Sequence, residues 1–191
     1  MIVKKAFFLI SIIFVFLFLI YLLLPSPTTI PPLPDSVKST ESGDTVQIPG
    51  VSAYFSQQKR DFVTKYYQDN FDKVSFLGLK LPSYRLNHPP ELSHEKIRDN
   101  LLSSYFEEVV HPFRESLFIN GWEPDVFFKG NKSAISRYVM IVDDQNYFSK
   151  TTLRPFYSNP ILRVINFFGI LASVFILYFL IKRIVFQKHE D

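Results

Sequence analysis

The stretch AFFLISIIFVFLFLIYLLL, residues Ala6–Leu24, contains no charged residue and no proline. At about 1.5 Å of rise per residue, a helix of this length crosses a hydrocarbon core of about 30 Å. A cleaved signal peptide has a shorter apolar region that ends in small residues, whereas this run ends in YLLLPSP. The sequence therefore predicts an uncleaved transmembrane helix, a signal anchor, at residues 6–24.

A second apolar run, VINFFGILASVFILYFLI, begins directly after Arg163 and ends before the pair Lys182-Arg183. It predicts another transmembrane helix at residues 161–183, so the residues between the two runs are anchored at both ends. Gly169 and Ser173 form a small-residue pair on this helix, which permits close packing against another helix. The pair is compatible with a homo-oligomer or with packing of the chain's own two helices.

Basic residues flank both runs on the sides of the chain termini: Lys4, Lys5, Lys182, Arg183 and Lys188. Short flanks with positive charge remain in the cytoplasm. We therefore expect residues 1–5 and 184–191 to be cytoplasmic and the central residues to lie outside the cell membrane. Arg154 and Arg163 lie on the outer side and weaken this assignment, although a long arginine side chain can reach the interface.

The chain carries a net charge of +3, and its pI is about 9.0. The excess of basic residues lies in the terminal segments, and the part between the apolar runs is close to neutral. The basic pI is therefore a signature of topology. We expect contact with the lipid bilayer and no nucleic-acid partner.

The chain has no cysteine, so an exported domain must fold by burial alone, and thiol nucleophiles and thiolate metal sites are excluded. Its 21 Phe and 10 Tyr supply large apolar side chains for a core. No glycine-rich phosphate loop, G-x-S-x-G or H-E-x-x-H motif is present. We expect neither an enzyme nor a bound cofactor. The glycosylation sequon at Asn131 is interpreted as a chance occurrence.

Residues 25–50 contain six prolines, and most of the others are small or polar. Such a segment cannot bury enough apolar surface to fold alone, and its first half favours extended polyproline II structure. We expect a linker here. It is either a tether that lifts the domain from the bilayer or a connector of no required length.

Residues 51–158 predict an α+β domain in which two amphipathic helices cover a short antiparallel sheet. An apolar stripe with a period of about 3.6 predicts the first helix at 52–71. Ser93, as an N-cap before further periodic apolar residues, predicts the second at 94–110. A short strand is expected at Val74–Leu81.

Beyond Pro112 the sequence predicts further short strands, with a tight turn at Asn120-Gly121, the strongest hairpin signal in the chain. The expected strands are Ser116–Ile119, a strand starting at Trp122, Val126–Phe128, Arg137–Val142 and Lys150–Tyr157.

The sharpest candidate site is Glu107-Glu108-Val109-Val110-His111, near the end of the expected second helix. On a helix, this spacing brings carboxylates and an imidazole to one face, as in a Glu-x-x-His metal motif. One copy is too little for a di-metal site, and His111 can instead interact with the carbonyls at the helix end. We expect no metal site, with Glu107, Glu108 and His111 as the remaining candidates.

Other polar residues lie among aromatic ones: Arg85, Asn87, Arg98, Asp99, Arg114 and Glu115. They either line a ligand groove or form ion pairs that hold loop 82–92 in place, and we favour the ion pairs. Trp122 is either a binding hot spot or a core residue, and we favour the core. His88 and His94, which flank the loop prolines, are not expected to bind a metal.

The sequence predicts a two-pass membrane-anchored protein whose extracytoplasmic domain is a binding or structural module for a protein or envelope component. Two alternatives remain. The chain is an accessory subunit of a membrane transport or translocation complex, or a small metal- or ligand-binding domain centred on residues 82–92 and His111.

Overall fold

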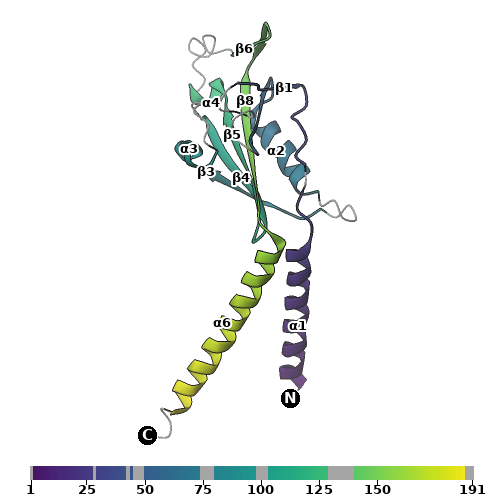
Figure 1. Ribbon diagram of the computed structural model, residues 1–191, viewed down its shortest axis with the longest axis vertical. Coiled ribbons are helices and arrows are strands. Elements are labelled where there is room, and N and C mark those ends of the chain that lie inside the picture. The colour runs from purple at the N-terminus through teal and green to yellow at the C-terminus, as the bar shows by residue number, and fades with distance from the viewer. Residues whose placement is uncertain are drawn as a thin grey trace. The chain divides into compact units, whose positions relative to one another are not determined.

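The computed structural model describes residues 2–27, 29–41, 44, 50–73, 80–97, 103–128 and 140–187. The chain divides into two compact units (Figure 1). The helical unit comprises Met1–Leu24 with Ser158–Asp191, and the domain comprises Pro25–Tyr157.

The helical unit consists of α1, Ile2–Leu23, and α6, Pro160–Gln187. By length and composition, both contain a segment that can cross a membrane. Most of their side chains are exposed, as in helices that face lipid. Where the two helices meet, the ring of Phe18 lies 5.6 Å from the ring of Phe167. The two expected apolar helices are therefore present, and their crossing of a membrane stays a prediction.

The domain is built on a six-stranded sheet with the order β1-β2-β8-β5-β4-β3, in which every pairing is antiparallel. The last strand in sequence, β8, lies between β2 and β5, so the fold closes only when the segment leading to α6 has paired. The strands are β1 Ser36–Lys38, β2 Ser52–Ser56, β3 Tyr84–His88, β4 Tyr105–His111, β5 Glu115–Trp122 and β8 Ser149–Tyr157. A separate hairpin pairs β6, Met140–Val142, with β7, Gln145–Tyr147.

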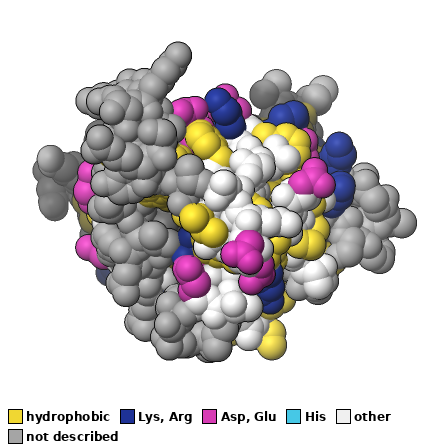
Figure 2. All heavy atoms as spheres, turned by 90° about the horizontal axis from the view of Figure 1, so that it is seen from above, with side chains coloured by type: hydrophobic (Ala, Val, Ile, Leu, Met, Phe, Trp, Pro, Cys, Tyr) yellow, Lys and Arg dark blue, Asp and Glu magenta, His cyan; other side chains and the backbone are white. Residues whose placement is uncertain are grey.

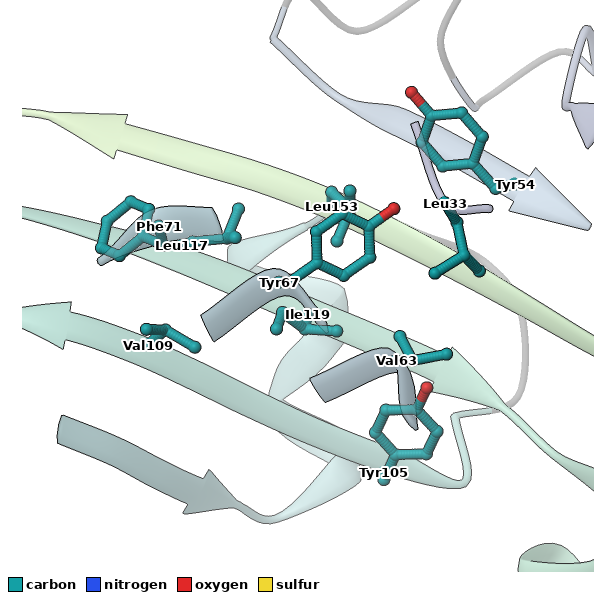
Figure 3. Packing of buried hydrophobic residues seen from close by; sticks show 10 residues of the cluster. All are labelled: Leu33, Tyr54, Val63, Tyr67, Phe71, Tyr105, Val109, Leu117, Ile119 and Leu153. Carbon is teal, nitrogen blue, oxygen red and sulfur yellow. The ribbon is translucent and has the colours of Figure 1, made fainter. Parts of the chain in front are cut away.

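One face of the sheet is covered by α2, Arg60–Phe71, which contributes Val63, Tyr67 and Phe71 to the main core (Figure 3). The remaining core residues come from the strands and from the segment before β1: Leu33, Tyr54, Tyr105, Val109, Leu117, Ile119 and Leu153. Burial raises the pKa of the Tyr67 and Tyr105 hydroxyls well above the usual range. These tyrosines therefore act as neutral core residues.

A smaller cluster, Ile97, Phe106 and Phe118, lies on the opposite face, because Phe106 alternates with the core residue Tyr105 along β4. Three short helices complete the described domain: η1 Pro90–Leu92, α3 Ser93–Lys96 and α4 Pro124–Phe127. The fold is α+β with an antiparallel sheet, as expected.

The expected helix at 94–110 is wrong, because α3 ends at Lys96 and the residues from Tyr105 to His111 form β4. Both faces of β4 are buried, and apolar residues on two faces imitate a helical stripe in the sequence. The first expected helix begins at Arg60, since Ser52–Ser56 pair as β2. Of the two amphipathic helices expected, the described residues contain only α2.

The expected strand at Lys150–Tyr157 is confirmed as β8, and β6 overlaps the one at Arg137–Val142. Val126–Phe128 is not a strand, since α4 includes residues 124–127. The expected strand at Val74–Leu81 falls mostly outside the described residues, although Lys73 and Lys80 on either side form an antiparallel bridge.

Asn120-Gly121 is not a turn but part of the continuous strand β5. A Cβ atom at Gly121 would lie 1.9 Å from Cζ of Tyr105, so the glycine is required by the tyrosine ring that packs over it. The turn between β4 and β5 is formed instead by Pro112, Phe113 and Arg114, and the Arg114 amide donates to the His111 carbonyl at 3.1 Å. Phe113 takes the positive φ of 63° that this turn needs.

The segment expected to be a linker is partly folded into the domain. Leu33 is buried in the main core, and β1 pairs with β2. Further along, the Lys150 ammonium lies 2.8 Å from the Asp44 carboxylate, and the Ser39 hydroxyl donates to the same carboxylate. A proline-rich segment that cannot fold alone is thus ordered by docking on a sheet formed by other residues.

We expect Gly121→Ala to lower the stability of the domain by about 1–3 kcal/mol, because the added methyl group displaces the buried Tyr105 ring. Denaturation of the detergent-solubilised chain, followed by the fluorescence of its single tryptophan, Trp122, measures this loss. Gly169→Ala is the control, since no atom lies within 4 Å of the Cβ position at Gly169. Equal midpoints for the two variants would contradict the prediction.

Candidate functional site

The candidate metal ligands, Glu107, Glu108 and His111, are separated by the strand geometry of β4. Glu107 and His111 lie on the face toward α2, while Glu108 points to the opposite face, where its carboxylate lies 2.9 Å from Nε2 of His88. Four residues along a strand span about 13 Å, so Glu107 and His111 cannot share an ion. Among the described residues, no group of three His, Asp or Glu side chains is placed to hold a metal. The helical turn that the metal hypothesis requires is not formed.

His111, Arg114 and Glu115 instead form a buried cluster at the β4–β5 turn, which we call the hairpin cluster. Nη2 of Arg114 lies 2.8 Å from Oε1 of Glu115, and Nδ1 of His111 lies 3.0 Å from the same oxygen. All three side chains are fully enclosed. Arg114 and Glu115 carry opposite charges in direct contact, and their attraction offsets the free-energy cost of burying them away from water.

The hairpin cluster also binds the start of the domain. Nη2 of Arg114 donates to the Pro25 carbonyl at 2.9 Å, and the Ser26 hydroxyl donates to Oε2 of Glu115 at 2.7 Å. In the sheet, Glu115 pairs with Tyr157, the last residue of β8. The first residue of the domain, Pro25, is therefore hydrogen-bonded to the β4–β5 turn, and the last, Tyr157, pairs with the strand residue that follows this turn.

The imidazole of His111 extends the cluster to the end of α2. Its ring stacks on Phe71 with 4.7 Å between centroids, and its Nε2 lies 3.2 Å from the Leu81 carbonyl oxygen and 3.6 Å from Oδ1 of Asp72. Both ring nitrogens thus face oxygen atoms, Oε1 of Glu115 on one side and the Leu81 carbonyl on the other. His111 joins segments rather than facing solvent.

A second polar cluster holds α2 to the sheet through Glu107. Nε of Arg60 lies 2.6 Å from Oε1 of Glu107, and Nε of Arg85 lies 3.6 Å from its Oε2. The two guanidiniums also donate to Asn87 and Thr64, at 3.2 and 3.0 Å. A buried carboxylate between two arginines is well compensated, which suits a structural contact.

The described contacts of Arg85, Asn87, Arg114 and Glu115 are therefore ion pairs and hydrogen bonds within the domain. Arg98, Asp99 and Asn131, and the side chain of His94, lie outside the described residues. Trp122 is only 8% exposed and lies at the end of β5, which places it in the core.

A shallow apolar groove lies beside the end of β8, between Ile30, Val51, Leu153 and Pro155. Gly50 forms part of its rim and continues directly into residues outside the described part of the chain. The described lining contains no charged side chain, so nothing there selects a charged ligand.

The helical unit contains a buried arginine that the sequence analysis treated only as an exception to the charge rule. Arg163 donates through Nη1 to the Leu22 carbonyl at 3.3 Å, and through Nε to the Ser158 hydroxyl at 2.7 Å. It thus caps the C-terminal end of α1, where unpaired carbonyls carry partial negative charge. Only its position beside an apolar run could have signalled this role.

Gly169 and Ser173 do not mediate the packing of α1 on α6. No atom lies within 4 Å of the Cβ position at Gly169, and the Ser173 hydroxyl donates to the Gly169 carbonyl of its own helix at 2.8 Å. The described contacts between the helices occur instead near Phe167 and Arg163.

Comparisons with protein family models, with curated protein sequences and with solved structures find no match to this chain.

We expect Glu115→Gln to destabilise the domain by about 3 kcal/mol, because it leaves the buried Arg114 guanidinium without the carboxylate it now contacts. Urea denaturation followed by Trp122 fluorescence measures this effect. Glu108→Gln is the matched control on the same sheet, since Glu108 is partly exposed and faces only the half-buried His88 in the described contacts. A loss at Glu108 as large as that at Glu115 would show that burial of the pair is not the cause.

Proposed function

We propose that the chain is a two-pass membrane protein whose domain, Pro25–Tyr157, is a binding or structural module at the outer surface of a cell membrane. The observation that carries the proposal is the fastening of Pro25 and Tyr157 to the single turn at Arg114 and Glu115. The chain therefore enters and leaves the domain at one end, next in sequence to the two apolar helices. A module with this connectivity is held by two short connections rather than by a flexible tether.

The polar contacts favour a module that acts without chemistry of its own. In the described part of the domain, the clustered charges at Glu107 and Glu115 are paired internally and have no open position for a substrate. The face seen in Figure 2 carries basic, acidic and hydrophobic side chains interspersed among the described residues. Such a surface suits recognition of a protein or envelope component better than attraction of a polyanion.

The proposed orientation places both termini in the cytoplasm. Arg163 is the basic residue nearest the outer end of α6, and its guanidinium is occupied by the carbonyls of Leu22 and Ser158. Because its N–H donors are satisfied by carbonyls inside the helical unit, we give this charge less weight than Lys182 and Arg183 in assigning the cytoplasmic side.

Labelling of single cysteines tests the topology directly, because the chain has no cysteine of its own. We expect a membrane-impermeant maleimide to label Glu91→Cys, an exposed position in the domain, in intact right-side-out vesicles. His189→Cys, in the terminal tail, should react only after the vesicles are opened. Labelling of both positions, or of His189→Cys alone, before opening would refute the proposed topology.

The alternative role, a subunit of a membrane transport or translocation complex, is favoured by the unoccupied space at Gly169. In that case, and equally in a homo-oligomer through Gly169 and Ser173, the apolar helices carry the contact. Replacing both helices by unrelated membrane spans separates the two roles. We expect proteins that co-purify with the native chain to remain bound to the chimaera, and their loss would support the subunit role. Gly169→Leu in the native chain is the companion variant, and it should leave the same partners bound.

A further inference from the structure

Exposed aromatic side chains gather at the end of the sheet that bears the β4–β5 turn. We call this the aromatic end and define it by Tyr84, Phe113, Phe156 and Tyr157. Phe113 is 73% exposed and Tyr84 67%, while Phe156 and Tyr157 are 40% and 46% exposed. Large apolar side chains grouped in this way on a soluble surface mark a contact with another phase or molecule.

The strand register places these residues in one region. Tyr84 is paired with Val110, Val110 with Ser116, and Ser116 with Phe156, so one row crosses β3, β4, β5 and β8. Side chains in such a row lie on the same face of the sheet. The turn that carries Phe113 follows this row directly along β4, and Tyr157 is the next residue of β8.

Phe113 is held in a backbone conformation that costs free energy. Its φ is 63°, a region that glycine adopts freely and that is unfavourable for other residues. Its side chain is among the most exposed of the large hydrophobic residues in the described part of the chain. An unfavourable backbone conformation together with an exposed aromatic ring, both at one turn position, is typical of a residue kept for a functional contact.

The connections to the helical unit begin at this same end. Pro25, bound by Arg114, follows Leu24 directly, and Tyr157 is separated from α6 by Ser158 and Asn159 alone. A chain of three residues reaches at most about 11 Å. If α6 crosses a membrane from Pro160 onward, the aromatic end is therefore the part of the domain that must lie nearest to that membrane.

The electrostatics of the turn suit a lipid interface. Next to Phe113, the charged residues Arg114 and Glu115 point inward and form an ion pair with each other. Both side chains are already buried in the domain, so insertion of the turn into lipid would not remove either charge from water. At the edge of the row, the guanidinium of Arg154 lies over the ring of Phe156, 4.7 Å from its centroid. The guanidinium of Arg154 is thus a positive charge beside the aromatic end, of the kind that anionic headgroups attract.

We propose that the aromatic end docks into the interfacial layer of the bilayer that holds the two helices. Phe113 inserts at the boundary of headgroups and acyl chains, and Tyr84 and Tyr157 place their hydroxyls among the headgroups. Aromatic side chains concentrate at this depth in membrane proteins because they combine apolar rings with polar edges. The proposal rests on the proposed function, since it requires that α1 and α6 cross the membrane.

The test uses the full-length chain in vesicles of phosphatidylcholine and phosphatidylglycerol, with single cysteines carrying an environment-sensitive fluorophore. Phe113→Cys reports on the aromatic end, and Ile141→Cys in β6 is the matched control with 70% exposure. Phe175→Cys in α6 reports on the hydrocarbon core. Lipids with a quencher near the headgroup or deep in the acyl chain measure the depth of each label.

We expect strong shallow quenching and a blue-shifted emission at residue 113, no quenching at 141 and deep quenching at 175. Deep quenching at 175 without quenching at 113 would overturn the docking proposal and leave the membrane proposal intact. Absence of quenching at both would refute the membrane proposal itself. A third outcome is a blue shift at residue 113 without lipid quenching that grows with the amount of protein per vesicle. It would show that the aromatic end contacts a second copy of the chain, and the proposal of docking on lipid would be wrong.

Discussion

The buried contact between Arg114 and Glu115 is the interaction on which the arrangement of the domain depends. It binds the start of the domain at Pro25, the end of β8 at Tyr157 and, through His111, the end of α2. These segments are far apart in sequence, and their groups meet at the β4–β5 turn. The start of the domain brings the Pro25 carbonyl and the Ser26 hydroxyl, and α2 brings the ring of Phe71. Because a buried charge is costly without its partner, this pair is stable in the interior only while both residues stay in contact and the surrounding segments cover them.

The two faces of the sheet differ in how they are covered. The face toward α2 holds the main core and the pairing of Glu107 with Arg60 and Arg85. The other face has only a small aromatic cluster near Phe106 and becomes exposed toward the turn. A sheet that is covered on one side and partly open on the other has a surface available for contact, here at the end where the chain continues into the apolar helices.

In the helical unit, the contacts of Arg163 bear on the proposed orientation of the chain in the membrane. A basic residue at the outer end of a membrane helix would normally count against the proposed orientation. Its guanidinium is bound to the carbonyl end of α1 and to Ser158, so its charge serves helix capping. The same contact joins the C-terminal end of α1 to the N-terminal end of α6, and no atom of the described residues lies within 4 Å of the Cβ position at Gly169.

The sequence by itself determined the features that depend on local composition: the two apolar helices, the α+β class and the final strand. Their residue patterns predict these elements without reference to any contact elsewhere in the chain. Tertiary structure decided the rest. β4 was predicted as a helix because burial on both faces, imposed by neighbours distant in sequence, resembles helical periodicity. Asn120-Gly121 has the residues of a turn, yet the ring of Tyr105 requires the glycine inside a strand. Glu107 and His111 were candidate ligands only on a helix, and strand geometry gave them separate partners. In each case the deciding contact joins different strands or helices, which a local sequence pattern cannot register.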